Sequence, residues 1–276
     1  MALPAAIRRD APIGVFDSGV GGLTVLRALS HALPSQDFIY LGDTARLPYG
    51  TKSPDTVSRY SLQCAQALLR RGIGALVVAC NTASASALGA LSARYPDLPI
   101  IGVIEPGAQA AIEASQSQHI AVIATEGTIN GGAYQTEIRR RNPAVRVLAR
   151  ACSMFVALAE EGWTSGPVAE AVAHRYLDPV FTAADAPDTL VLGCTHFPIL
   201  TAAIRAVIPP DVRIVDSAAT TAQTLMARMA PALQGAPPGP GRITWLATDD
   251  AERFARVGGR FFGQALSAAA VEVIDL

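Results

Sequence analysis

The chain of 276 residues is long enough for one large domain or two smaller ones, and its 50% hydrophobic and 16% charged residues are typical of folded globular proteins. The net charge of −1, without a basic tract, gives no reason to expect nucleic acid or an anionic membrane as a partner. The apolar runs are too short for membrane helices. The N-terminal MALPAAIRRDAP lacks the order of a secretory signal, so we expect a cytoplasmic protein.

Ten short apolar runs alternate with helical patterns, which predicts βα units and a mainly parallel sheet. At SPD (53–55) a capping serine and a first-turn proline open one of the helices. The Gly/Pro-rich segment PALQGAPPGPG (231–241) is expected to be a surface connection. The expected strands, in chain order, are residues 12–16, 38–43, 75–80, 99–104, 119–125, 145–151, 189–194, 213–217, 243–248 and 271–276.

The chain also contains a weak internal repeat. IGVFDSGVGG opens one half at Ile13, and IAVIATEGTINGG opens the other at Ile120. Each half later presents a strand that ends in a cysteine, Cys80 in the first and Cys194 in the second. Ligands of parallel α/β sheets bind beyond the carboxyl ends of the strands. If the halves face each other about an approximate twofold axis, the two thiols flank one site from opposite sides.

Polar residues follow each of these cysteines, in the motifs ACNT (79–82) and GCTH (193–196). A cysteine at a strand end just before a helix start experiences the positive end of the helix dipole, which favours the thiolate. Donors at the same place suit an anion site with a base beside it. The alternative for any free cysteine is plain packing, which is the role expected of Cys64 and Cys152. In the cytoplasm all four thiols should be reduced.

The glycine-rich loop DSGVGG (17–22) admits two interpretations. With Asp43 at the end of the next strand, it partly matches a dinucleotide-binding fingerprint, but Thr24 replaces the third glycine and no GK[ST] follows. Asp17 and Ser18 fit better as polar groups that face a ligand.

The sequence gives little support for a metal or for pyridoxal phosphate. Its cysteines and histidines are scattered, without the spacing that zinc sites need, so we expect no metal site. The single lysine, Lys52, lies in a polar loop, whereas a Schiff-base lysine usually lies in a sheltered pocket, so we expect no cofactor. His196 is interpreted as an acid or base partner. The other histidines are expected to be structural or surface residues: His31, His119 and His174.

Five motifs, in this order, resemble those of the glutamate racemases in the cofactor-independent aspartate/glutamate racemase superfamily. They are IGVFDSGVGGLTVL (13–26), LGDTARLPYGTKS (41–53), VVACNTASA (77–85), GVIEPGA (102–108) and VLGCTHFPIL (191–200). The similarity continues through ACSMFVALAEEG, IVDSA and WLATDDAERFARVGGRFFG, so it covers nearly the whole chain. The resemblance implies an α/β fold of two pseudo-symmetric domains, each a mainly parallel sheet flanked by helices, with the active site in the cleft between them. We assign residues 1–98 and 211–276 to the first domain and 99–210 to the second.

The resemblance also implies an activity, the cofactor-independent interconversion of L- and D-glutamate, which supplies D-glutamate for peptidoglycan. A homodimer is implied as well, in line with the frequency of twofold assemblies. The family's two catalytic thiols correspond to Cys80, which acts on D-glutamate, and Cys194, which acts on L-glutamate. Asp17 and His196 would assist them, and a further acid near the histidine falls at Glu160, with Glu161 beside it. The substrate contacts that carry over are Asp17, Ser18, Tyr49, Gly50, Asn81, Thr82, Thr195 and His196.

Racemisation explains why two such motifs are needed. One base is required on each face of the α-carbon, because a single thiol returns the proton to the side from which it came. Three alternatives remain: a thiol redox protein, for which the sequence lacks CxxC; a binding module without catalysis; and aspartate in place of glutamate as substrate.

Overall fold

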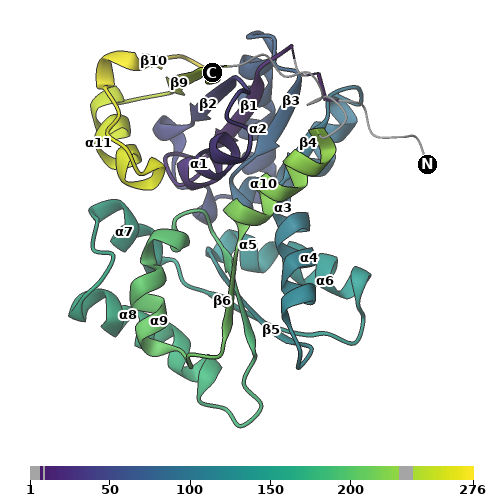
Figure 1. Cartoon of the computed structure of the whole chain (residues 1–276), viewed down its shortest axis with the longest axis vertical. Helices are drawn as coiled ribbons and strands as arrows, with labels where there is room; N and C mark the ends of the chain where they lie inside the picture. The colour runs from purple at the N-terminus through teal and green to yellow at the C-terminus, as the bar shows by residue number, and fades with distance from the viewer. Residues whose placement is uncertain (1–6, 9, 230–238) are drawn as a thin grey trace.

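The computed structural model describes residues 7, 8, 10–229 and 239–276. Most of the segment 231–241, expected to be a surface connection, lies outside the described residues. The described residues form two sheets, one above the other along the long axis of the molecule (Figure 1). All strand pairs within the described residues are parallel, as the alternation of apolar runs and helices predicts.

Within the described residues the first sheet has six strands, with β2 and β1 at its centre. In spatial order they are β10 (Val271–Val273), β9 (Ile243–Ala247), β2 (Phe38–Gly42), β1 (Ile13–Asp17), β3 (Ala75–Val78) and β4 (Ile100–Gly102). The second sheet has four strands, in the order β6 (Arg146–Ala151), β5 (His119–Ala124), β7 (Thr189–Gly193) and β8 (Arg213–Asp216). The expected strands therefore all form, most of them shorter by a residue or more.

The strand order confirms the internal repeat. In the first sheet β2, β1, β3 and β4 are neighbours in that order, and β6, β5, β7 and β8 repeat it in the second. In each sheet the direction of winding reverses between the first and third strands in chain order, which are β1 and β3 in the first sheet and β5 and β7 in the second. Such a switch point is where open α/β sheets bind ligands, so both sheets have one candidate position at their carboxyl edges.

Strand pairing does not follow the domain boundaries expected from the sequence. The strand at 100–102 was expected in the second domain but pairs with β3 of the first sheet. The strand at 213–216 was expected in the first domain but pairs with β7 of the second sheet. By sheet membership, the chain crosses to the second sheet after β4 and returns after β8. The division of the chain into two domains remains a prediction.

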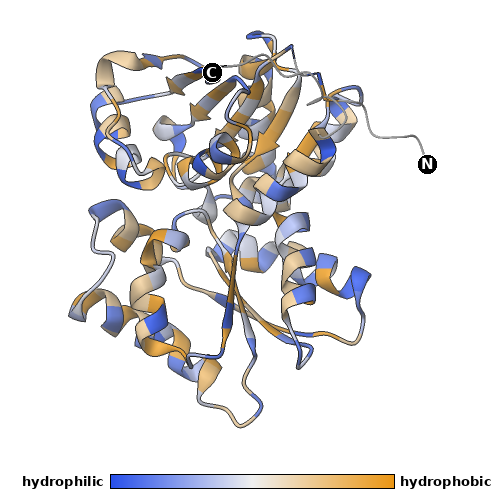
Figure 2. Ribbon diagram, in the orientation of Figure 1, coloured by the Kyte–Doolittle hydropathy of each residue, from blue (hydrophilic) through white to orange (hydrophobic). Residues whose placement is uncertain are grey.

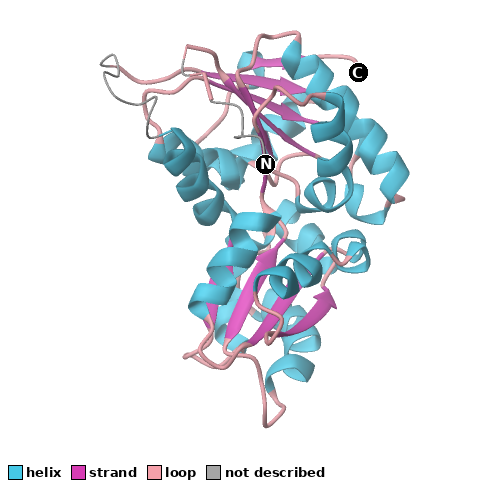
Figure 3. Ribbon diagram, turned by 90° about the vertical axis from the view of Figure 1, so that its right-hand side faces the viewer, coloured by secondary structure: helices cyan, strands magenta, loops and turns pink. Residues whose placement is uncertain are grey.

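Helices cover both faces of each sheet (Figure 3). In the first half these are α1 (Leu23–Ala32), α2 (Pro54–Leu69), α3 (Asn81–Arg94), α10 (Ser217–Met229) and α11 (Ala251–Phe262). In the second half they are α4 (Ile104–Ala114), α5 (Glu126–Gly131), α6 (Ala133–Arg141), α7 (Met154–Glu161), α8 (Pro167–Phe181) and α9 (Thr201–Val207). Four 3-10 helices complete the described elements: η1 (Thr44–Arg46), η2 (Tyr49–Thr51), η3 (Phe197–Leu200) and η5 (Ala268–Ala270).

Three apolar clusters form the core. One packs α2 and α3 on the first sheet, and another packs α4 and α6 on the second. The third includes α1, α10 and α11 together with α7, α8 and α9, so it joins the two halves. Strands of the first sheet are accordingly mostly apolar (Figure 2). At the start of α2, Ser53 accepts a hydrogen bond from the Thr56 N–H at 3.3 Å, as the SPD motif predicts. Among the described residues, no helix is both long and apolar enough to cross a membrane.

Candidate functional site

Cys80 and Cys194 occupy equivalent places in the two sheets. Each follows the third strand of the repeat, β3 for Cys80 and β7 for Cys194, and thus lies at a switch point. Both side chains are almost fully buried, with 5% and 6% of their surface exposed. The DSGVGG loop connects them, because Ser18 contacts the Cys80 Sγ and Gly21 lies against Thr195 and His196. The fold therefore brings the two motifs to one place between the sheets.

Cys80 is the residue that caps the N-terminus of α3. Its Sγ accepts a hydrogen bond from the Ala83 N–H at 3.5 Å and contacts the Ser18 Oγ at 3.7 Å. Burial and the charge of Asp17 nevertheless raise the pKa of Cys80 to about 12, against the lowering effect of the Ala83 N–H and Ser18. The free protein therefore holds Cys80 as a neutral thiol near pH 7.

Asp17, at the end of β1, is a fully buried carboxyl group. Its Oδ2 accepts a hydrogen bond from the Gly19 N–H at 3.0 Å, while Oδ1 has no hydrogen-bond partner among the residues that the structure describes. Burial raises the pKa of Asp17, and the charge of His196 and three backbone N–H groups oppose that rise. A buried carboxylate oxygen without a partner is costly, so this atom is a candidate acceptor for a cationic ligand group.

Cys194 differs from Cys80 in the element that comes after it. The sequence predicts a helix start directly behind both cysteines, but Cys194 precedes a turn and the 3-10 helix η3, and α9 begins only at Thr201. Its neighbour is instead His196, whose Nδ1 is 3.8 Å from the Cys194 Sγ. The helix start predicted directly behind each cysteine is thus present for Cys80, where burial nevertheless keeps the thiol neutral, and is absent for Cys194.

His196 is linked to Glu160, at the end of α7. The His196 Nε2 and the Glu160 Oε1 are 3.1 Å apart, whereas Glu161 is exposed. Burial lowers the pKa of His196, but the hydrogen bonds to Cys194 and Glu160 and the charges of Cys194 and Asp17 outweigh it and raise the pKa to about 10. His196 is therefore cationic at neutral pH. The expected acid near the histidine falls at Glu160, as the first of the two glutamates.

The glycine-rich loop contacts the GCTH motif directly. A side chain at Gly21 would overlap both the His196 ring and the Thr195 hydroxyl, so only glycine allows this close approach. The Thr24 hydroxyl donates a hydrogen bond to the Thr195 carbonyl at 3.1 Å. Gly21 and Thr24 therefore serve the contact between the two halves, rather than a dinucleotide.

Asp43, which a dinucleotide fingerprint would assign to a ribose, has a structural role. It is fully buried and forms an ion pair with Arg46 at 2.8 Å, and it accepts hydrogen bonds from the hydroxyls of Tyr49 and Thr248. Both oxygens of the Asp43 carboxylate therefore accept hydrogen bonds from protein groups, and the side chain does not point to a ligand.

Tyr49 and Gly50 lie at the contact between the halves, but the Tyr49 side chain is only 1% exposed and its hydroxyl is directed to Asp43. A side chain at Gly50 would overlap Thr125, which follows β5. A ligand contact from Tyr49 and Gly50 would therefore use their main chain.

Asn81 and Thr82, in the first turn of α3, are both bonded to the second half. The Tyr134 hydroxyl on α6 donates a hydrogen bond to the Asn81 Oδ1 at 2.8 Å. The Thr82 hydroxyl is 3.0 Å from that of Thr125 and 3.1 Å from that of Thr128. These bonds hold the start of α3 against the second sheet, close to Cys80.

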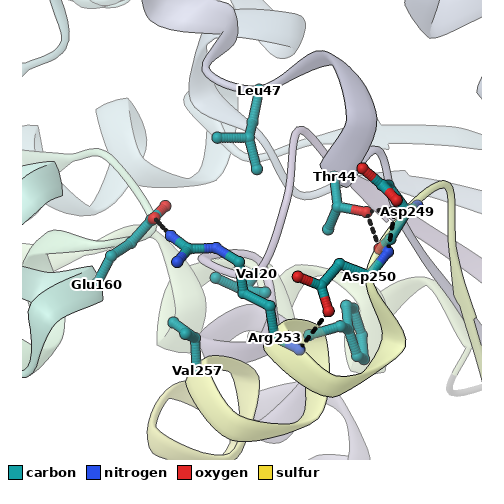
Figure 4. Close-up of a pocket in the computed structure, with 9 residues that line it drawn as sticks. Val20, Thr44, Leu47, Glu160, Asp249, Asp250, Arg253 and Val257 are labelled. Carbon is teal, nitrogen blue, oxygen red and sulfur yellow. Dashed lines mark hydrogen bonds and ion pairs between the residues drawn. The ribbon is translucent and has the colours of Figure 1, made fainter. Parts of the chain in front are cut away.

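A cavity of about 330 Å³ opens beside Glu160 and Val20 of the glycine-rich loop. In Figure 4 the Arg253 guanidinium on α11 and the Glu160 carboxylate point toward each other at its wall, with Val20 and Leu47 also lining it. The Arg253 Nη2 donates to the Glu160 Oε2 at 2.8 Å. The cavity thus adjoins the Glu160 end of the chain of contacts that leads through His196 to Cys194.

No role was expected from the sequence for Tyr134, Thr125 or Arg253, although Thr125 lies in IAVIATEGTINGG and Arg253 in WLATDDAERFARVGGRFFG. Each lies far along the chain from the motif that it contacts, and an arginine on an exposed helix face or a tyrosine in a helix is common. Cys64 and Cys152 are fully buried, as expected of packing residues, and all four cysteines are free thiols. In the described part of the chain, no group of three or more Cys, His, Asp or Glu is arranged to hold a metal ion.

The other histidines have structural or surface positions, as expected. The His119 Nδ1 is 2.7 Å from the Asp185 carbonyl oxygen, and the His174 Nδ1 is 2.9 Å from an Asp178 carboxylate oxygen on an exposed face of α8.

The family model for Asp/Glu/Hydantoin racemase matches residues 13–225. The chain belongs to this family. A glutamate racemase of Geobacter metallireducens is 51% identical over 256 residues, which cover 91% of this chain and 92% of the relative. The resemblance seen in the motifs is thereby confirmed.

Solved structures agree with the fold as well. Glutamate racemase from Thermus thermophilus, in complex with beta-chloro-D-alanine, matches with a TM-score of 0.84 and 43% identity over 96% of this chain and 97% of the other. The enzyme from Francisella tularensis, in complex with D-glutamate, matches with a TM-score of 0.89 and 34% identity over 97% and 98% of the two chains. The expected α/β fold of two parallel sheets flanked by helices is confirmed.

Proposed function

We propose that this racemase interconverts L- and D-glutamate by a two-base mechanism, with Cys80 and Cys194 as the bases. The observation that carries the proposal is the pair of thiols at equivalent switch points, each at the carboxyl end of a buried strand and each with its own polar partners. The names of the relatives support glutamate as the substrate. The repeat supports an approach from opposite faces of one α-carbon.

The reaction is a proton exchange at the α-carbon. From D-glutamate, the Cys80 thiolate takes the α-proton and becomes a thiol, and the electron pair of the broken C–H bond stays on the substrate. The Cys194 thiol then gives its proton to the opposite face, which yields L-glutamate and a Cys194 thiolate. The reverse reaction uses the thiols in the reverse order. Solvent exchange restores the starting protonation state of the pair.

The carbanion has to be stabilised by the surrounding donors. Hydroxyls of Ser18, Thr82 and Thr195, the Asn81 amide and nearby backbone N–H groups are candidates to bind the α-carboxylate, where the charge develops. The unpartnered Oδ1 of Asp17 is suited to the substrate ammonium group. That ammonium charge would also favour the thiolate of Cys80, which the free site keeps neutral.

On the Cys194 side, His196 provides a cation beside the sulfur, and Glu160 holds the imidazole ring from its other nitrogen. An imidazolium is a suitable partner for a thiolate and can exchange a proton with it. Because both thiols are nearly buried, entry of glutamate requires the halves to separate and close again over the substrate.

The test is to measure racemisation of L- and D-glutamate beside L- and D-aspartate, without added cofactor. We expect glutamate turnover that survives dialysis against a chelator and does not require pyridoxal phosphate. Turnover of aspartate but not of glutamate would show that aspartate is the substrate. A reversible disulfide between Cys80 and Cys194 as the only reactivity would favour a redox protein instead. Absence of α-proton exchange with either substrate would leave a binding module.

The biological setting and assembly belong to the same proposal. D-glutamate made in the cytoplasm would supply peptidoglycan synthesis, and depletion of the protein should therefore be relieved by external D-glutamate. We further propose a homodimer, since twofold assemblies are the most frequent oligomers. A monomer in light scattering across working concentrations would be evidence against it.

A further inference from the structure

The C-terminal helix α11 contacts Glu160 with two arginines, although α11 belongs to the first half and Glu160 to the second. Arg253 donates to the Glu160 carboxylate Oε2 at 2.8 Å, and Arg260 donates to the Glu160 carbonyl oxygen at 3.0 Å. Residues seven positions apart lie on the same face of a helix. Phe261, next to Arg260, packs edge-on against the His196 ring with centroids 5.0 Å apart. One helix thus holds the main chain and side chain of Glu160 and one face of His196.

Both oxygens of the Glu160 carboxylate are therefore occupied. Oε1 is bonded to the His196 Nε2 and Oε2 to the Arg253 Nη2, so the plane of the carboxylate is fixed between two donors. Burial raises the pKa of Glu160, but the hydrogen bond and charge of His196, followed by those of Arg253, outweigh it and lower the pKa. Glu160 stays ionised, which keeps its acceptor directed at His196.

We propose that Arg253 is a positioning residue for the reaction, which acts through Glu160 on His196 and thereby on Cys194. This inference rests on the proposed racemase mechanism. Arg253 does not contact the thiol itself. Arg253 lies in the stretch WLATDDAERFARVGGRFFG, but more than ninety positions separate it from Glu160, so the sequence gives no sign of their contact. Cys80 contacts Ser18 and Ala83 instead, so the effect of Arg253 is confined to the step in which Cys194 moves the proton.

The main test compares Arg253→Met with Arg256→Met. Arg256 is exposed on the same helix and forms no hydrogen bond or ion pair with any residue that the structure describes, so its replacement is a matched control. We expect Arg253→Met to lower kcat about 10-fold with little change in KM, by analogy with the effect of partners that orient metal-bound histidines. Arg253→Lys should restore most of this loss, because an ammonium still pairs with Glu160. Arg256→Met should behave like the parent protein.

Isotope effects locate the affected step. The two enantiomers have equal free energies, so kcat/KM must remain equal in both directions in every variant. If the Cys194 step has slowed, the primary isotope effect with α-deuterated L-glutamate rises in Arg253→Met, and that with α-deuterated D-glutamate falls toward one. Equal changes with both substrates, or none, would overturn the proposal.

The acid limb of the kcat–pH profile is a second readout. The charged groups that face Glu160 are His196 from the turn after β7 and Arg253 and Arg260 from α11, while Asp249 and Asp250 line the cavity beside it. Removal of the Arg253 cation raises the Glu160 pKa, so the acid limb moves to higher pH. In a Glu160→Gln background, Arg253→Met should have no further effect on kcat.

A spectroscopic readout separates this inference from the proposed function. The ring signals of His196 in NMR should change in Arg253→Met and not in Arg256→Met, whether or not the parent racemises glutamate. If the parent is inactive but the His196 signals change in Arg253→Met, the proposed mechanism is wrong and the positioning role stands. An active parent whose His196 signals and kinetics do not respond to Arg253→Met would sink the positioning role alone.

Discussion

Cys80 and Cys194 hold the same place in two copies of one strand order, yet their surroundings differ. Cys80 lies at the N-terminus of α3, with a backbone N–H and the Ser18 hydroxyl on its sulfur and an anion, Asp17, nearby. Cys194 has no α-helix behind it and lies beside a cationic imidazole that is held by Glu160. The main partner of the Cys80 sulfur is a fixed helix terminus, whereas the main partner of the Cys194 sulfur is a titratable side chain. Equivalent positions in a repeat thus do not imply equivalent electrostatics.

Removing either thiol should have the largest effect on racemisation. We expect Cys80→Ala and Cys194→Ala each to lower racemisation by at least about 10³-fold, because one face of the α-carbon loses its acid and base. In heavy water, NMR of the α-proton should still show slow exchange of D-glutamate when only Cys80 remains and of L-glutamate when only Cys194 remains. Racemisation near the parent rate in either variant would rule out two bases.

Replacing the partners should separate the two sides. We expect His196→Asn and Asp17→Asn each to lower kcat about 10²-fold, since each removes a group that assists proton transfer. The isotope effect with α-deuterated L-glutamate should rise in His196→Asn, and that with α-deuterated D-glutamate should rise in Asp17→Asn. If both variants shift the same isotope effect, the partners do not serve separate thiols.

The cation on the Cys194 side also predicts a dependence of stability on pH. The pKa of His196 in the folded protein, about 10, is above the unfolded value of 6.5. Its contribution to the free energy of unfolding is therefore fully present below pH 6.5 and is lost as the pH rises toward about 10. Denaturant unfolding between pH 7 and 9 should show a decline of at most about 1.4 kcal/mol per pH unit. The same decline in His196→Asn would assign it to another group.

The two other cysteines should have the smallest effects. Cys64 and Cys152 are fully buried and lie outside the pair, so their replacement by alanine should leave kcat within about two-fold and lower stability by about 1 kcal/mol, the cost of a small cavity. Parallel kinetics and urea unfolding would measure both. A large loss of turnover in Cys152→Ala, without loss of stability, would contradict its assignment to packing.

The sequence predicts local features of this fold well. Every expected strand forms, because buried parallel strands are continuous apolar runs, and the SPD motif caps α2 as its residues indicate. The helix expected behind Cys194 does not form there, since Pro198 follows and the chain makes a 3-10 helix first. The short edge strands β4 and β8 each pair in the sheet opposite to the one expected, because one strand's sequence does not tell which sheet it joins.

The candidate site divides in the same way. Residues within the motifs, such as Cys80 and His196, could be found because residue type and strand-end position together indicate chemistry. Tyr134, which donates to Asn81, and Arg253, which donates to Glu160, come from other parts of the chain. Only the packing of one half on the other brings them close, so residue type alone carried no signal.

The two crossings of the chain have a consequence for how the protein folds. After β4 of the first sheet, α4 packs on the second sheet, and after β8 of the second sheet, α10 packs beside α1 in the first half. Each sheet is therefore covered in part by a helix that directly follows a strand of the other sheet. A chain cut at either crossing would leave one sheet with an uncovered apolar face. We expect the halves to unfold in a single cooperative transition.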